Sequence, residues 1–299
     1  MTRPDPTLDA ARVRRAFARA AAGYESAAAL QREVEARLLE QLDRLGERIP
    51  TRVLDLGAGP GRAAQAMHAR WPKAQVLALD FALPMLRQIA RAPWWKLGPQ
   101  RLHALCADVN ALPLADGSVD ALFSNLCLQW VDDLPRTLRG FRRVLRPDGL
   151  LLFSTFGPGT LRELRDAFTQ AGAGDPVTPF AHIQRVGDAL QDAGFRDPVL
   201  YAEQFSLTYP DARTLMRELQ TLGAHNARAD RRRGLMGKTR MARVADAYEA
   251  LRRDGVLPST WEVIYAQAFA PPPGQPLRGG GEELASVPLS AIPIRRRSG

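Results

Sequence analysis

The sequence contains little cysteine and no long hydrophobic run. Cys106 and Cys127 are its only cysteines, and neither belongs to a Cys-x-x-Cys pair. Such a pair of thiols cannot build a disulfide framework, so we expect a reducing, cytoplasmic location and no metal site. No segment approaches the roughly 20 apolar residues that a membrane-spanning helix needs. The first residues, MTRPDPTLDAARVRRAF, lack the apolar core of a signal peptide, and we expect neither export nor a membrane span.

Acidic residues are outnumbered by basic ones. The 41 lysines and arginines exceed the 32 aspartates and glutamates, and the formal net charge is +9 at pH 7. Such a balance favours an acidic partner, which can be nucleic acid, an anionic membrane surface or an acidic protein. An arginine-rich composition with no partner gives the same number. Residues 225–255 hold much of the excess, with nine basic residues against four acids.

Short apolar runs alternate with helical patterns along the chain. Apolar residues recur every three to four positions over residues 12–45, which predicts a helical N-terminal segment. Apolar runs then predict five strands, at 52–58, 74–80, 103–108, 119–125 and 149–156. Helical patterns follow the first, second and fourth of these runs. This alternation is typical of an α/β fold in which helices cover both faces of a parallel sheet.

The C-terminal part of the chain adds two strands and an insert. The strands are predicted at 197–209 and 259–270, and a helical insert at 211–255 separates them. The tail, residues 271–299, is rich in proline and glycine and has no periodicity, so we expect disorder there. The chain is therefore divided into a helical segment at 1–48, an α/β domain at 49–270 and this tail.

Residues 53–62, VLDLGAGPGR, form an apolar run that ends in the glycines Gly57, Gly59 and Gly61. Glycines let backbone approach a ligand closely, and the helix that follows offers free N–H groups at its start. Glycines also make ordinary tight turns, so the motif alone is weak evidence. Asp80 and Asp108 strengthen it because they end the next two strands. There the first can bind both hydroxyls of a ribose, and the second can accept a hydrogen bond from an adenine amine.

The spacing of these residues, followed by CADVNALPL and SNLCLQW, resembles the class I S-adenosylmethionine-dependent methyltransferases over residues 50–156. The dehydrogenase fingerprint G-x-G-x-x-G would need a third glycine at position 62, where this sequence has Arg62. The resemblance implies a Rossmann-like, seven-stranded sheet whose short seventh strand is antiparallel and lies between strands 5 and 6. It implies S-adenosylmethionine as cofactor, with the glycine turn at its methionine part. The implied cofactor-binding residues are Asp55, Gly57, Ala58, Gly59, Gly61, Asp80, Phe81, Met85, Ala107, Asp108, Val109 and Asn125.

Three segments, at 16–31, 124–130 and 248–265, resemble the malonyl-acyl-carrier-protein O-methyltransferases of biotin synthesis. This resemblance extends to residue 270 and does not include the tail. It implies methyl transfer to the free carboxylate of malonyl thioester on acyl carrier protein, which gives the methyl ester that starts pimeloyl and biotin synthesis. It also implies that the N-terminal helical segment folds over the cofactor as a lid.

Methylating a carboxylate makes modest chemical demands. A free carboxylate has a pKa of about 4 and is already ionised at pH 7, so no general base is needed. The protein mainly has to hold the nucleophile close to the methyl group and in line with it. We therefore expect an Arg or a Tyr to hold one oxygen while the other faces the methyl group. The candidate catalytic residues are Tyr24, Asn125 and Gln129.

The candidates for substrate binding are Tyr24, Gln31, Trp130, His225, Arg231, Arg232 and Arg233. Each has an ordinary structural alternative. Tyr24 and Trp130 can be core residues, Gln31 can be a polar neighbour of an apolar stripe, and a lone histidine such as His225 is more often a surface residue. The three arginines can hold the malonyl carboxylate, orient an acidic carrier protein, or form a solvated face.

Three other functions stay open. A methyltransferase for a free small acid or a quinone precursor would not need the basic insert. A nucleic-acid methyltransferase would use the same arginines on phosphates. Against a nucleic-acid partner, the N/D-P-P-Y/F signature for base amines is absent, and neither cysteine follows a proline, the motif suited to attack on cytosine. An assembly factor would bind the cofactor and turn over no acid.

Overall fold

The computed structural model describes residues 8–89, 102–174, 177, 179–222, 237–272, 277–279 and 282–284. Four residues that the sequence singles out, His225, Arg231, Arg232 and Arg233, lie outside the described residues. Within those residues, no helix is both long enough and apolar enough to cross a bilayer.

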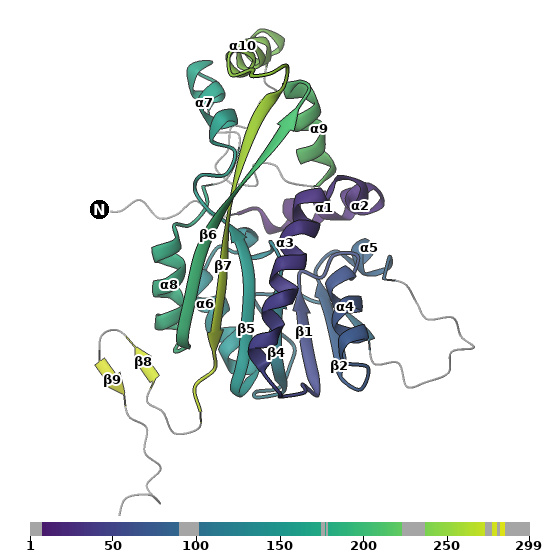
Figure 1. Ribbon diagram of the computed structural model, residues 1–299, viewed down its shortest axis with the longest axis vertical. Helices are drawn as coiled ribbons and strands as arrows, with labels where there is room; N and C mark the ends of the chain where they lie inside the picture. The colour runs from purple at the N-terminus through teal and green to yellow at the C-terminus, as the bar shows by residue number, and fades with distance from the viewer. Residues whose placement is uncertain are drawn as a thin grey trace, which may run out of the picture.

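Seven strands form one mixed sheet in the order β3-β2-β1-β4-β5-β7-β6. They are β1 (Arg52–Leu56), β2 (Gln75–Asp80), β3 (Leu102–Cys106), β4 (Val119–Ser124), β5 (Leu145–Phe156), β6 (Arg196–Tyr209) and β7 (Leu257–Phe269). β1 to β5 pair in parallel, whereas β7 lies antiparallel between β5 and β6. This arrangement confirms the predicted α/β class and the predicted place of the seventh strand (Figure 1).

β7 is longer than the short seventh strand that the family resemblance implies, and it agrees within two residues with the strand predicted at 259–270. β7 runs over 13 residues and pairs with β6 along its whole length, from Leu257 to Phe269. Only the part of β7 from Val263 onward also pairs with β5. The remainder leaves the sheet with β6 as a two-stranded arm, which carries α9 (Ala212–Thr221) and α10 (Lys238–Glu249) (Figure 1). β7 is long because it belongs both to the sheet and to this arm.

Helices cover both faces of the sheet. Successive residues of a strand point to opposite faces, and on one face Val53 and Phe123 pack in a core with α3 (Ala29–Glu40) and α4 (Arg62–Arg70). On the other face Leu54 and Leu122 pack in a core with α6 (Leu134–Val144) and α8 (Ile183–Asp192). The central strands are therefore buried on both sides, as their unbroken apolar runs predict.

The N-terminal helical segment is broken into several short helices. α1 (Ala10–Ala20) is capped by Asp9, which accepts a hydrogen bond from the Arg12 amide. A 3₁₀ turn (Ala21–Gly23) and α2 (Tyr24–Ala27) follow, and Ala28 has a non-helical backbone between α2 and α3. These breaks turn the chain, so that Leu30, Val34 and Leu38 of α3 pack on the sheet, while α1 and α2 lie across the upper ends of the strands (Figure 1).

The helices predicted after the first, second and fourth strands are α4, α5 (Leu83–Leu86) and α6. The chain also forms α7 (Arg162–Gln170), which packs against β7 and α10, and 3₁₀ turns at Gln41–Leu45 and Leu128–Trp130. In the tail, β8 (Leu277–Gly279) pairs antiparallel with β9 (Glu282–Leu284). The disorder predicted for the tail stays a prediction.

Candidate functional site

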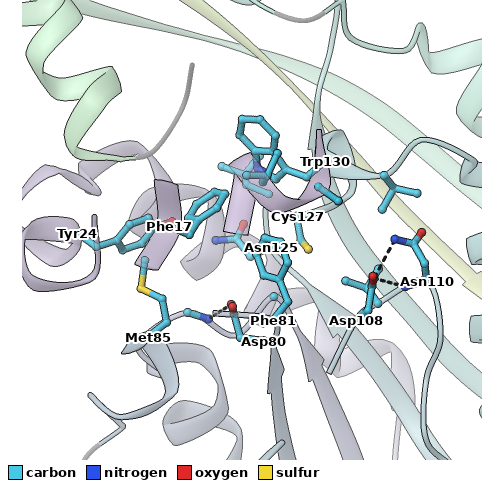
Figure 2. A pocket seen from close by; sticks show the side chains of 17 residues that line it. Phe17, Tyr24, Asp80, Phe81, Met85, Asp108, Asn110, Asn125, Cys127 and Trp130 are labelled. Atoms are coloured by element: carbon cyan, nitrogen blue, oxygen red, sulfur yellow. Dashed lines mark hydrogen bonds between the residues drawn. The ribbon is translucent and has the colours of Figure 1, made fainter. Parts of the chain in front are cut away.

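Two adjoining cavities lie under α1 and α2, at the carboxyl ends of β1, β2 and β4. From β1 the chain adds β2 and β3 on one side and then continues with β4 and β5 on the other, so the strand order reverses between β1 and β4. In open α/β sheets ligands bind in the crevice at such a point. The first cavity, of about 730 Å³, is lined by Ala10, Val13, Phe17, Tyr24, Gly57, Gly59, Asp80, Phe81, Met85, Asp108, Val109, Asn110, Asn125, Leu126, Cys127, Trp130 and Val131. Ten of these are predicted site residues. Figure 2 labels several of them around the space, among them Tyr24, Asp80 and Asn125.

The glycine turn after β1 forms the floor where the two cavities meet. Gly57 and Gly59 have φ angles of +68° and +54°, which side chains disfavour. No atom of the described residues lies within 4 Å of the Cβ position of Gly59, and this residue lines both cavities. The position is open space at a site that a ligand can approach closely. Gly61 lines neither cavity and instead precedes the first residue of α4.

Asp80 fixes the turn to the end of β2. Its Oδ2 accepts a hydrogen bond from the Gly59 amide at 3.0 Å, and its Oδ1 accepts one from the Ala82 amide at 2.7 Å. Burial raises the pKa of this carboxyl, and these amides oppose that shift. Because each carboxylate oxygen has two lone pairs, Asp80 can still accept from ligand hydroxyls in the cavity.

Three aromatic rings enclose the upper part of the first cavity. The rings of Phe17 and Trp130 meet edge to face, with centroids 5.5 Å apart, and Phe17 lies 6.1 Å from Phe81. Phe17 comes from α1, whereas Phe81 and Trp130 follow β2 and β4 (Figure 2). The lid thus contacts both sides of the cavity through one side chain. Met85 packs in the same cluster as Tyr24.

The third strand contributes polar groups at the far side. Asp108 accepts hydrogen bonds from the amide and the side chain of Asn110, at 2.9 and 2.8 Å (Figure 2). Asn110 in turn accepts a bond from the Thr137 hydroxyl, which ties this loop to α6. Val109 lines the cavity between them. Ala107 lines neither of the two cavities, and its amide donates to the Asp80 carbonyl at 3.2 Å.

The second cavity, of about 430 Å³, lies between α3 and the glycine turn. It is lined by Tyr24, Glu25, Ala28, Gln31, Arg32, Glu35, Asp55, Gly57, Ala58, Gly59, Pro60, Arg62, Ala63 and Asn125. Asp55 Oδ2 and Gln31 Oε1 are buried there and have no hydrogen-bond partner among the described residues. An unpartnered buried acceptor is costly, so these two oxygens mark a place for a donor such as an ammonium group.

Charges of both signs surround this second cavity. Burial raises the pKa of Asp55 well above its usual value and raises that of Glu35. Arg62 forms an ion pair with Glu35 at 2.8 Å, and Arg32 donates to the Glu25 carbonyl. Acceptors for an ammonium group and guanidinium donors for a carboxylate therefore line one small space. This donor and acceptor set suits the zwitterionic end of an amino acid.

Asn125 joins the lid to the sheet between the two cavities. Its Nδ2 donates to the Gln31 carbonyl at 2.9 Å, and its Oδ1 accepts a bond from the Ser154 hydroxyl at 2.8 Å. Ser154 is itself fully buried on β5. Asn125 therefore fixes α3 against β4 and β5 and has one side of its amide toward both cavities.

Tyr24 and Cys127 are neutral in this environment. Burial and the nearby Asp80 carboxylate raise the pKa of the Tyr24 hydroxyl. The same two causes raise the pKa of the Cys127 thiol to about 12. Tyr24 is thus a hydrogen-bond donor at neutral pH, and Cys127 is a protonated thiol rather than a nucleophile.

Gln129 is not brought together with the other candidates. Its Nε2 donates to the Leu126 carbonyl at 2.7 Å, and it lines a separate cavity of about 910 Å³ with Thr155, Phe180 and Arg185. The 3₁₀ turn that points Trp130 into the first cavity points Gln129 toward β5. The roles predicted for all of these residues stay predictions.

Several lining residues have no counterpart among the sequence candidates. Phe17, Asn110 and Cys127 line the first cavity, and Arg32, Glu35 and Arg62 line the second. Arg62 directly follows the glycine turn, which was the one available signal for it. The described residues contain no group of three or more His, Cys, Asp or Glu side chains arranged to hold a metal ion.

Comparisons with known proteins match both the region of the glycine turn and the chain as a whole. A family model described as a methyltransferase domain matches residues 54–153, which include the glycine turn and Asp80. The chain is 54% identical to the malonyl-[acyl-carrier protein] O-methyltransferase of Xylella fastidiosa (strain M23) over 293 residues, 97% of this chain and 98% of that protein. The enzyme of the same name from Methylovorus sp. (strain MP688) is 48% identical, over 91% of this chain and 92% of that protein.

Solved structures share the fold at low sequence identity. The YcgJ protein of Bacillus subtilis superposes with a TM-score of 0.54 at 16% identity, over 79% of this chain and 99% of that one. A methyltransferase-like protein of Bacillus halodurans C-125 gives a TM-score of 0.55 at 15% identity, over 79% and 99% of the two chains.

Proposed function

The chain belongs to the malonyl-[acyl-carrier protein] O-methyltransferase family, and from this we propose that it methylates the free carboxylate of malonyl-[acyl-carrier protein] with S-adenosylmethionine. The observation that carries the proposal is the 54% identity that extends over 97% of the chain, lid and arm included. The product is a methyl ester. The ester has no charge at the end that carried the carboxylate, which suits elongation toward a pimeloyl thioester and biotin. We place the enzyme in the cytoplasm, where its two free cysteines would stay reduced.

The residues present fit the cofactor. Asp55 and Gln31 have buried acceptor oxygens without partners, which would take the ammonium group of the methionine part. Arg32 and Arg62 line the same cavity and would take its carboxylate. Asp80, Asp108 and the aromatic side chains of the first cavity would hold the nucleoside part. Gly59 separates these two halves with open space above it.

Tyr24 and Asn125 line both cavities, and so lie where the two halves of the cofactor would join. Bound there, S-adenosylmethionine supplies an electrophilic methyl group on a sulfonium. The malonyl carboxylate is already ionised, so these residues have to orient it rather than remove a proton. The raised pKa of Tyr24 keeps its hydroxyl protonated, and it would donate to one carboxylate oxygen and leave the other to attack.

We retain Arg231, Arg232 and Arg233 as proposed contacts of the substrate. The sequence predicts a helical insert at 211–255, in which three consecutive residues would point in different directions. One could then reach the malonyl carboxylate while the others attract the carrier protein. Each should be replaced singly by Gln and assayed with malonyl-acyl carrier protein and with malonyl-coenzyme A. An arginine that holds the carboxylate should lose turnover on both substrates. A docking arginine should lose it only on the carrier-bound one.

The function is tested by complementation and by product analysis together. Expression in a strain blocked at the start of biotin synthesis should restore growth without biotin, and the purified protein should form malonyl-acyl carrier protein methyl ester. Gly59→Val, which fills the open space at the glycine turn, is the inactive control. The proposal fails if folded, cofactor-binding protein neither supports growth nor forms the ester. Turnover of a free small acid, or RNA-dependent methylation with steep salt dependence, would identify the alternative.

A further inference from the structure

A second face of the lid helix lines an open groove outside the cofactor site. The groove, of about 920 Å³, is lined by Ala16, Arg19, Ala20 and Gly23 of the lid and by Arg217, Gln220 and Thr221 of α9. Thr221 packs closely on the lid, since a Cβ at Gly23 would lie 3.3 Å from its methyl group. The groove thus lies where two elements that are almost 200 residues apart in sequence come into close contact.

The charge of the groove has one sign. Arg19 and Arg217 are exposed on its two sides, and among the residues that the structure describes no carboxylate lines it. α1 has four arginines and no acid, and the one acid of α9, Glu218, accepts a hydrogen bond from the Tyr209 hydroxyl. In the described part of the chain neither Arg19 nor Arg217 forms an ion pair. Arg217 donates a hydrogen bond to Thr214 within its own helix and interacts electrostatically with Asp211, the N-cap of that helix.

The groove is distinct from the cofactor cavity, although both use α1. Val13 and Phe17 line the cavity, whereas Ala16, Arg19 and Ala20 line the groove. Because successive helical residues are about 100° apart, these sets form two adjacent stripes of one helix. The small side chains of the second stripe leave a shallow floor between the two guanidinium groups. An arginine fork suits carboxylates, which it can bind in bidentate fashion.

We propose that the groove between α1 and α9 is a docking surface for the acidic face of the carrier protein, with Arg19 and Arg217 as its charged contacts. This rests on the proposed function, which makes a carrier protein the substrate. Carrier proteins of this class are strongly acidic, and complementary charge increases the rate of association and fixes orientation. The surface also lies on the lid itself, next to the cavity where the thioester has to arrive.

The test compares Arg19→Glu and Arg217→Glu with a control, Arg139→Glu. The control reverses the charge of an exposed arginine on α6, a helix that does not line the groove. Three substrates are used: malonyl-acyl carrier protein, malonyl-coenzyme A and malonyl-pantetheine, which lacks phosphate. At low salt we expect each groove variant to lose about tenfold in kcat/KM on the carrier-bound substrate, mainly through KM. We expect little change on the two small thioesters and none for Arg139→Glu.

Direct binding separates this inference from the proposed function. Fluorescence anisotropy of labelled acyl carrier protein should show tight binding to the wild type and to Arg139→Glu, and about tenfold weaker binding to the groove variants. If the wild type methylates no malonyl thioester but this pattern holds, the docking surface stands and the substrate assignment falls. Equal losses of kcat/KM on malonyl-acyl carrier protein and on malonyl-coenzyme A would mean that the arginines bind the phosphate of the pantetheine chain, and this would overturn the proposal. Wild-type binding by both groove variants would overturn it too.

Discussion

Gly57 and Cys127 are in direct contact across the floor of the site. A Cβ at Gly57 would lie 2.5 Å from the Cys127 sulfur and 2.7 Å from its Cβ. The residue after β1 and the turn after β4 are therefore packed as closely as backbone allows. Gly59, two residues later, has nothing within 4 Å of its Cβ position. The first position has no room for a side chain, whereas the second leaves open space in the cavity that we propose for the cofactor.

This contrast predicts different outcomes for two conservative substitutions. Gly57→Ala should destabilise the fold by about 2 kcal/mol or more, because it adds a clash to an unfavourable positive φ. Gly59→Ala should cost only about 1 kcal/mol of stability from its positive φ but should lose most of its affinity for the cofactor. Thermal unfolding and calorimetric titration with S-adenosylhomocysteine measure the two effects. A Gly59→Ala protein with wild-type affinity would show that the cofactor does not pass this residue.

The second cavity makes a prediction about the amino-acid end of the cofactor. Asp55→Asn and Gln31→Leu each remove one of the two buried acceptors. Each should weaken binding of S-adenosylhomocysteine by about 1–3 kcal/mol, the usual range for hydrogen bonds to a charged group. Neither should weaken binding of 5′-methylthioadenosine, which has the nucleoside and no amino-acid part. Equal losses with both ligands would mean that these side chains act only through the fold.

The sequence predicts much of this site because its signals are local. The glycine turn, Asp80 and Asp108 directly follow strands, and parallel strands bring their carboxyl ends together at one edge. Its position after a strand groups Gln129 with the other candidates. A 3₁₀ turn points neighbouring residues in different directions, however, and Trp130 faces the first cavity while Gln129 faces another. Phe17 reads as an ordinary apolar helix residue until the breaks at 21–23 and 28 show how α1 lies.

The arm that β6 and β7 form is equally hard to predict from the local sequence pattern. β6 and β7 each have one uninterrupted strand sequence, so nothing in the local pattern marks where they leave the sheet and become an arm. The distance between Arg19 and Arg217 in sequence is also too great for any periodicity to relate them. These features depend on packing between distant segments, which one sequence does not state.

The free energy of unfolding should depend on pH through the carboxyl group of Asp120. It accepts hydrogen bonds from the Thr51 and Arg52 amides at 2.7 and 2.9 Å and pairs with Arg146 at 2.6 Å. Partial burial alone would raise the pKa of this carboxyl, but the hydrogen bonds outweigh it and lower the pKa. A lowered pKa stabilises the fold above the unfolded value near 4, and the contribution is lost as the pH falls below it.

Asp120→Asn should therefore cost about 1 kcal/mol of stability at pH 7, and the gap to the wild type should close as the pH approaches 3. Urea unfolding at several pH values measures both. Asp116→Asn is the matched control, since Asp116 forms only an exposed ion pair with Arg143 and should change stability little. A gap that stays constant with pH would mean that the amide of the variant, not the lost charge, destabilises the protein.

The two stripes of α1 predict that cofactor and carrier protein bind cooperatively. Phe17 contacts the cofactor cavity and Arg19 the groove, so a ligand that holds α1 in place on one side prepares it for the other. Coupling between two ligands is reciprocal. S-adenosylhomocysteine should therefore tighten carrier binding by about fivefold or more, and the carrier should tighten cofactor binding by the same factor. Calorimetric titrations with the two ligands added in either order measure this coupling.

Phe17→Ala should reduce the coupling while both ligands still bind, because it removes the ring that joins the lid to Phe81 and Trp130. Identical affinities with and without the second ligand would show that α1 is already fixed and transmits nothing.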